Sequence, residues 1–198
     1  MGSNDLRKRA VWQDLSGAKA KDAESAFFNS FEKAFENTDY RVYDKPKNFN
    51  KIYVDYPLDS ETKKVIYNPP NPITKHGISP DYVIENKITK KRLFVEIKRQ
   101  DGWVEGKPRS AGRGNAHERL CKYFTPGLLK IIRKESMINE PGLPFWVVFV
   151  GDITRDPCRV REITCWFDGF DAHYFFWRED TAKNLINHFD AQLKDLLC

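Results

Sequence analysis

The sequence predicts an α/β protein in which a central mixed β-sheet is flanked by helices on both faces. Segments rich in β-branched and aromatic residues alternate along the chain with segments whose apolar residues recur at helical spacing. One strand-like segment, residues 145–150, is apolar throughout, which is typical of a strand covered on both faces. The length of 198 residues and the hydrophobic share of 40% suffice for one core, so we expect a single domain over residues 1–198.

The N-terminal third is expected to hold one helix and two short strands. Residues 16–37 place aromatic side chains on one stripe between charged ones, which predicts an amphipathic helix packed into the core. Residues 40–43 and 52–56 have the composition of strands, and the prolines between positions 69 and 72 predict a surface loop.

The middle of the chain predicts an antiparallel hairpin followed by a long loop. Residues 82–85 and 92–98 are β-rich and are joined by the polar turn 86–91. Residues 101–114 are then rich in glycine and basic residues, and a loop of this length in a small domain usually has a function.

The C-terminal half alternates between helices and strands. Helices are expected over residues 115–124, 126–134, 157–167 and 181–197, and strands over residues 145–150 and 173–177. Two of the helices have explicit start signals, since Thr125 before Pro126 and Asp156 before Pro157 each combine a capping residue with a proline suited to the first turn.

Positive charge is concentrated in the middle of the chain. The net charge is +5, but residues 87–134 contain fourteen Lys and Arg against four Asp and Glu, a net of +10, so the remainder carries −5. Clustered cations that face phosphates gain affinity from counterion release, which makes a polyanion a candidate partner. A solvated basic face explains the same charge equally well.

Two classes of protein are disfavoured by composition. The chain has neither an apolar run long enough to span a bilayer nor the apolar stretch of a signal peptide, so we expect it to stay in the cytoplasm. Its four cysteines form no CxxC pair and have no histidine at ligand spacing, so we expect reduced thiols and neither a zinc cluster nor a disulfide framework.

Two carboxylates and a lysine mark the ends of the predicted hairpin strands. Asp81 opens the first strand, while Glu96 and Lys98 close the second and share a face because they are two positions apart. Mg²⁺ prefers such oxygen ligands, and an adjacent ammonium group can polarise an attacking water. An exposed charge pair is the alternative for Glu96 and Lys98, but the apolar strand and the basic loop after it favour a site.

A second group of polar residues follows in Arg113-Gly114-Asn115-Ala116-His117-Glu118-Arg119. Arginine, asparagine and glutamate can all recognise base edges in a major groove, and small neighbours let the backbone approach closely. The same residues also fit an ordinary helix start, with Asn115 as the cap and Glu118 as its capping-box partner.

The pattern Pro80-Asp81, fourteen residues, Glu96-Ile97-Lys98 resembles the active-site signature of the PD-(D/E)XK nuclease superfamily. The resemblance implies a restriction-endonuclease-like architecture, with a mixed five-stranded sheet flanked by helices, and Mg²⁺-dependent hydrolysis of phosphodiesters. It implies catalytic roles for Asp81, Glu96 and Lys98, and a metal site at Asp81, Glu96 and Ile97.

The motif Gly114-Asn115-Ala116-x-Glu118-Arg119 is similar to the recognition motif of the EcoRI-like branch of that superfamily. Further segments, including Glu96 to Lys107 and Ser110 to Arg119, resemble type II restriction endonucleases of the MunI/MfeI kind. The resemblance implies cleavage of duplex CAATTG after the first C, with a 5′ AATT overhang. The expected base-reading residues are Arg113, Gly114, Asn115, Ala116, Glu118 and Arg119. Lys107, Arg109 and Lys122 flank this motif and have no obvious core role, so we expect them to contact the DNA backbone. For His117, we expect either a DNA-backbone contact or a structural role.

A palindromic site must be cut on both strands, so we expect a two-fold homodimer with one catalytic centre in each subunit. A host would also have to protect its own sites, which makes a companion DNA adenine methyltransferase an expected genetic partner. Two alternatives stay open at this stage. One is a structure-selective or repair nuclease of the same superfamily, and the other is a non-catalytic DNA-binding regulator.

Overall fold

The fold is built on one mixed sheet with the strand order β1-β2-β3-β4-β5. The computed structural model describes residues 3–44, 46–108, 117–178 and 181–198. The strands are β1 (Tyr40–Asp44), β2 (Tyr82–Asn86), β3 (Arg92–Arg99), β4 (Phe145–Val150) and β5 (Tyr174–Trp177). The first three strands pair antiparallel and the last two join in parallel, which confirms the predicted mixed five-stranded sheet and its central hairpin.

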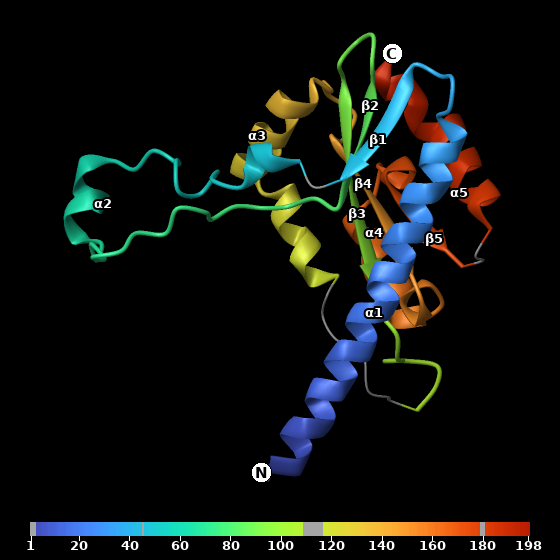
Figure 1. The fold of residues 1–198 in the computed structure, drawn as a ribbon, viewed down its shortest axis with the longest axis horizontal. Coiled ribbons are helices and arrows are strands. Elements are labelled where there is room, and N and C mark those ends of the chain that lie inside the picture. Colours follow the sequence, from blue (N-terminus) through green and yellow to red (C-terminus); the bar gives the residue numbers. More distant parts are fainter. Residues whose placement is uncertain (1–2, 45, 109–116, 179–180) are drawn as a thin grey trace.

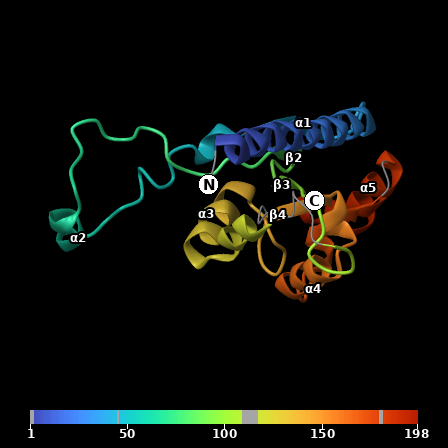
Figure 2. The ribbon, with the colours of Figure 1, turned by 90° about the horizontal axis from the view of Figure 1, so that it is seen from below.

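Helices cover both faces of this sheet (Figures 1 and 2). The α-helices are α1 (Ser3–Ala34), α2 (Ser60–Val65), α3 (Pro126–Ser136), α4 (Pro157–Trp166) and α5 (Ala182–His188). The helices α1 and α5 pack on one face of the sheet, while α3 and α4 pack on the other.

The core follows from the alternation of side chains along the two central strands. In β3, Val95 and Ile97 point into the cluster formed with α1 and α5, whereas Phe94 points into the cluster formed with α3 and α4. Every residue of β4 is buried, as its uniformly apolar sequence predicts. From α1, Phe27 is fully buried and lies 5.8 Å from the ring of Trp146 in β4.

Residues 50–77, which include α2, project away from the sheet (Figure 1). The predicted strand at 52–56 is wrong, because these residues form turns and a bend and belong to none of the strands in the described part of the chain. The two ends of the projection meet where the Tyr53 N–H donates to the His76 carbonyl at 3.0 Å. Gly77 lies so close to the Phe49 carbonyl that any Cβ would be 1.8 Å from its oxygen. Large apolar side chains are exposed along the projection: Tyr53, Val54, Tyr56, Leu58, Val65, Ile66, Tyr67 and Ile73.

Several helix boundaries differ from the predictions. The first helix begins at Ser3 instead of residue 16, and the predicted closing helix over 181–197 is broken into α5, a π-helix over 189–193 and a 3₁₀-helix over 194–197. The aromatic stripe used to predict the first helix marks only the part of α1 that packs into the core, so it does not show where the helix begins. The described part of the helix predicted at 115–124 is a 3₁₀-helix, Glu118–Phe124.

The two predicted helix starts are both present, but only one is capped by a side chain. The Asp156 carboxylate accepts from the main-chain N–H groups of Cys158 and Arg159 at the start of α4. The Thr125 hydroxyl instead donates to the Lys122 carbonyl at 2.7 Å, so it caps nothing in α3.

Two expectations about protein class can be compared with the fold. All four cysteines are free thiols, as predicted. Within the described ranges, every helix is either too short or too polar to cross a bilayer.

Candidate active site

Asp81 lies immediately before β2, where the antiparallel pairing with β3 begins. Tyr82 is the first residue of β2 and pairs with Val95 of β3, and the Asp81 N–H donates to the Val95 carbonyl at 3.0 Å. Beyond this point β3 continues alone beside β4, so the Ile97 N–H has no strand partner on the β2 side. The Asp81 carboxylate accepts that N–H at 2.8 Å, which brings Asp81 to the segment that carries Glu96 and Lys98.

Glu96 and Lys98 form an ion pair on one face of β3. Their side chains are only 11% and 18% exposed, so this is not the exposed surface pair that was the alternative. The Lys98 ammonium also lies 3.4 Å from the Ile97 carbonyl. The predicted catalytic residues are therefore gathered at one place, the start of β2 and the adjoining stretch of β3.

Tyr123, from the 3₁₀-helix over 118–124, completes this cluster and was not predicted. Its buried hydroxyl donates to the second oxygen of Glu96 at 3.1 Å. Burial, with the Glu96 charge beside it, raises the pKa of Tyr123, so the hydroxyl keeps its proton and remains a donor. Nothing in the sequence links two residues 27 positions apart, so only the folded chain could reveal this contact.

The electrostatics of the cluster favour a bound cation. Burial and the neighbouring Glu96 carboxylate raise the pKa of Asp81 to about 7, against the opposing effects of the Lys98 ammonium and the Ile97 N–H. Glu24 of α1 adds negative charge in the same direction. Two carboxylates that resist sharing a buried space can both ionise when a positive ion lies between them.

The donor set fits Mg²⁺. Asp81 and Glu96 offer carboxylate oxygens, and Ile97 can contribute only its main-chain oxygen because its side chain is apolar. Among the described residues, no group of three or more His, Cys, Asp or Glu side chains is arranged to hold a metal ion. An ion at this cluster would therefore rely on water and on the substrate phosphate for the rest of its shell, as Mg²⁺ usually does.

The predicted base-reading residues are only partly within the described chain. Arg113, Gly114, Asn115 and Ala116, together with the predicted backbone contact Arg109, lie outside the described residues. Glu118 and Arg119 are exposed at the start of the 3₁₀-helix over 118–124.

Two of the predicted backbone contacts are exposed and one is not. Lys122 is exposed, and so is Lys107, whose ammonium lies 4.2 Å from the centre of the Trp103 ring. His117 is fully buried and stacks on Trp166 with ring centres 5.3 Å apart, so the prediction that it contacts the DNA backbone is corrected. The imidazole fills a space against α4, and its interior position leaves no surface for a phosphate.

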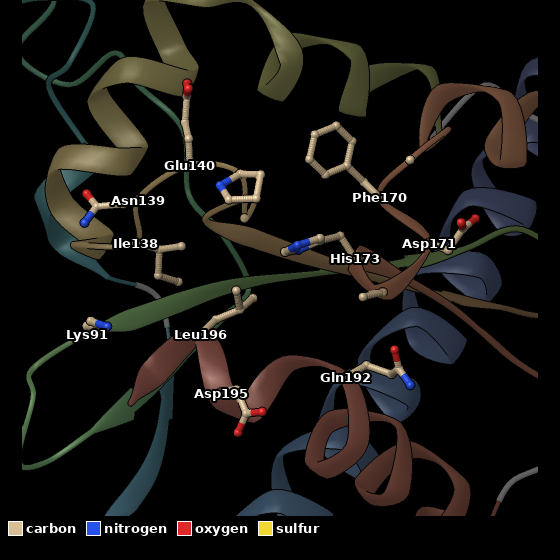
Figure 3. A pocket seen from close by; sticks show the side chains of 14 residues that line it. Lys91, Ile138, Asn139, Glu140, Phe170, Asp171, His173, Gln192, Asp195 and Leu196 are labelled. Atoms are coloured by element: carbon tan, nitrogen blue, oxygen red, sulfur yellow. The ribbon is translucent and has the colours of Figure 1, made fainter.

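A separate pocket of about 430 Å³ lies at another part of the molecule (Figure 3). It is lined by the segments 138–142, 169–173 and 192–196 together with Lys91, and it contains none of the predicted site residues. At its wall, the His173 Nε2 accepts from the Leu143 N–H and its Nδ1 donates to the Phe145 carbonyl, so both ring nitrogens are occupied. Burial lowers the pKa of His173 to about 4, and we assign it a structural role.

Comparison with known proteins gives a consistent result over the full chain. The family model described as type II restriction enzyme MunI matches residues 1–198. The type II restriction enzyme MunI of a Mycoplasma species is 53% identical over 201 residues, which covers 100% of both proteins. The crystal structure of MunI restriction endonuclease in complex with cognate DNA is similar with a TM-score of 0.80 at 53% identity, over 94% of this chain and 97% of that one. The chain therefore belongs to the MunI family of type II restriction enzymes, and the cluster at Asp81 lies on the fold of a site-specific endonuclease.

Proposed function

We propose that this enzyme cleaves double-stranded DNA at CAATTG, after the first C, by Mg²⁺-dependent hydrolysis that leaves a 5′ AATT overhang. The observation that carries the proposal is the cluster of Asp81, Glu96 and Lys98, in which the Asp81 carboxylate accepts the Ile97 N–H and Lys98 pairs with Glu96. Glu118 and Arg119, which belong to the proposed base-reading motif, are exposed at the start of the 3₁₀-helix whose Tyr123 bonds to Glu96. Membership of the MunI family supports it.

The roles of the chain's own residues follow from their contacts. Asp81, Glu96 and the Ile97 carbonyl would hold Mg²⁺, which when bound stabilises negative charge on the phosphate and the departing 3′ oxygen. The Lys98 ammonium, held by Glu96 and near the Ile97 carbonyl, orients an attacking water and balances charge as the phosphorus becomes pentacovalent. Tyr123 holds the Glu96 carboxylate in one orientation, so that its other oxygen stays directed toward Lys98.

Sequence discrimination is assigned to the segment around residues 113–119. Asn115, Ala116, Glu118 and Arg119 would read the inner AATT, and Arg113 would read the guanine of the outer pair. Asparagine can form two hydrogen bonds to adenine, glutamate accepts from base amino groups, and arginine donates to guanine. These residue types therefore match the bases of the DNA sequence CAATTG.

Two partners follow from this substrate. A homodimer would place one active site on each strand of the palindrome. A companion adenine methyltransferase would protect the host, because N6 methylation removes an amino proton that Glu118 could accept and adds bulk beside it.

A cleavage map tests the proposal. One plasmid is digested with and without Mg²⁺ and every end is sequenced, with Asp81→Ala as the variant. We expect ends only at CAATTG, only with Mg²⁺, and no cleavage by Asp81→Ala although it still binds the site. Cleavage of duplexes that lack CAATTG would favour the repair nuclease, and binding without scission under any condition would favour the regulator.

A further inference from the structure

We infer that α4 supports the two described flanks of the proposed DNA-reading segment, residues 102–105 and residue 117, and that Asp156 and His117 are the positioning residues that fasten these flanks to the helix. The inference rests on the proposed function. In the sequence, the proposed base-reading residues begin at Arg113, eight positions after one flank, residues 102–105, and they lie on either side of the other flank, residue 117. Both flanks are described, and both bond to the same ten-residue helix.

The first flank is held by a single buried carboxylate. One oxygen of Asp156 accepts from the Cys158 and Arg159 N–H groups at the start of α4, at 3.0 and 3.3 Å. The other oxygen accepts from the Val104 and Glu105 N–H groups, the latter at 3.3 Å. Asp156 is 0% exposed, so it forms four main-chain bonds without competition from water.

Neighbouring contacts strengthen the first flank. The Gly102 N–H donates to the Asp152 carboxylate at 2.8 Å, just before α4 begins. Further along the helix, Arg161 forms an ion pair with Glu105. In both views of the fold, the loop after β3 runs close to α4 (Figures 1 and 2). Burial alone would raise the pKa of the Asp156 carboxyl, but the main-chain N–H groups around it hold this pKa below its usual value. The carboxyl therefore stays ionised near neutral pH.

The second flank is held by His117, whose ring lies among three side chains of α4. It stacks on Trp166 at an interplanar angle of 14°, and its Nε2 lies 3.1 Å from both Arg159 and Glu162. Arg159 and Glu162 are themselves joined at 2.7 Å. The next two residues, Glu118 and Arg119, are exposed, so the chain is fixed at 117 and presents its polar side chains immediately afterwards.

By fastening both flanks, α4 fixes the described ends of this stretch of chain, residues 102–105 and 117–119. Base recognition requires side chains held within a fraction of an ångström, and a segment restrained before binding loses less entropy when it binds. None of the four main-chain bonds of Asp156 involves Asp81, Glu96 or Lys98. Weakening the contacts between α4 and the two flanks should therefore reduce sequence discrimination and affinity more than the rate of hydrolysis at saturating DNA.

The test uses Asp156→Asn, which keeps the size of the side chain but sets an amide NH₂ against two N–H donors. We measure the ratio of the cleavage rate at CAATTG to the rate at sites that differ by one base. We expect this ratio to fall about tenfold or more, because the variant loses roughly one charge-assisted hydrogen bond. KM should rise, while kcat at CAATTG changes less than threefold. Asp168→Asn, the same change at an exposed aspartate just after α4, should leave both constants and the ratio unchanged.

His117→Gln tests the second flank by the same assay and should shift the ratio in the same direction. Unchanged discrimination in both variants, each folded at the assay temperature by thermal melting, would overturn the inference, as would a loss confined to kcat.

Hydrogen exchange on the wild-type enzyme avoids any problem of folding. The Val104 and Glu105 amides should exchange slowly, and more slowly still with a CAATTG duplex than with a duplex lacking it. Exchange as fast as in an exposed loop would overturn the inference. If the wild-type enzyme cleaved another sequence, the proposed function would be overturned but this inference would not. The exchange rates of Val104 and Glu105 test their attachment to α4 independently of which sequence is cut.

Discussion

At the scale of single residues, the Asp81 carboxylate lowers the stability of the metal-free folded protein, because it is held in a largely buried place beside Glu96. Its carboxyl is ionised in the unfolded chain above pH 4, but in the metal-free folded protein burial and Glu96 raise its pKa to about 7. Between these two values the unfolded state has lost a proton that the folded state still binds. Stability must therefore fall as the pH rises from about 4 to about 7, and this loss remains above pH 7.

Asp81→Asn should remove this dependence. The amide oxygen can still accept the Ile97 N–H, and no charge then opposes Glu96. We expect the variant to be more stable than the wild type by roughly 1–4 kcal/mol at pH 8 without Mg²⁺, and the difference to vanish near pH 4. Urea denaturation at several pH values measures it. A difference that is independent of pH would contradict the assignment.

Tyr123→Phe tests the hydroxyl that holds Glu96. The variant keeps the ring, which packs 5.2 Å from Phe145, and loses only the bond to the carboxylate. We expect the single-turnover cleavage rate at saturating Mg²⁺ and DNA to fall about tenfold, the value of roughly one buried hydrogen bond to a charged group. Tyr174→Phe, whose hydroxyl reaches only Thr164 at the surface, serves as the control. Equal rates for both variants would show that Tyr123 is only a packing residue.

At the scale of elements, the site depends on the offset between two neighbouring strands. β2 begins at Tyr82, opposite Val95, while β3 runs on past Val95 to Arg99 beside β4, and this offset leaves the Ile97 N–H free to bond to Asp81. α1 fixes the start of β2, because Phe27 stacks on Tyr82 with ring centres 5.5 Å apart.

Phe27→Ala should therefore affect both stability and the site. Removing a fully buried phenylalanine leaves a cavity next to Tyr82, and we expect a loss of about 3–5 kcal/mol in the free energy of unfolding. Chemical denaturation measures the loss. Ile88→Ala, at a side chain that is 72% exposed, should change it by less than about 0.5 kcal/mol. Similar losses for the two variants would contradict the packing described for α1.

At the scale of the whole molecule, charge and shape are distributed unevenly. Residues 87–134 carry a net charge of +10 and include Glu96, Lys98 and the proposed base-reading residues, whereas the remainder of the chain carries −5. The projecting segment 50–77 adds an exposed apolar surface away from the sheet (Figure 1).

Because residues 87–134 carry a net charge of +10, DNA affinity should depend strongly on salt. If six or more phosphates are contacted, the association constant falls by about a thousandfold or more from about 50 to about 200 mM salt. Fluorescence anisotropy with Asp81→Ala, which prevents cleavage, gives this slope. Lys122→Ala should make the slope shallower by about one, and an affinity that is insensitive to salt would contradict a phosphate-binding role for the basic middle.

Local patterns in the sequence were sufficient to predict much of this protein. The alternation of strand and helix segments, the hairpin around residues 86–91 and the capped start of α4 depend on neighbours close in sequence, so periodicity and capping chemistry predict them. The gathering of Asp81, Glu96 and Lys98 was also predictable, because the hairpin register and the two-residue repeat of a strand place them together.

Only the tertiary structure decided the contacts between distant segments. Tyr123 reaches Glu96 and His117 is buried against α4 because helices from separate parts of the chain pack on the same face of the sheet. The segment 52–56 has strand composition yet forms turns, since it lies on the projection and pairs with none of the five described strands. The composition of a segment determines whether it favours a helix or a strand. Whether it forms that structure depends on the strands and helices that pack beside it in the folded chain.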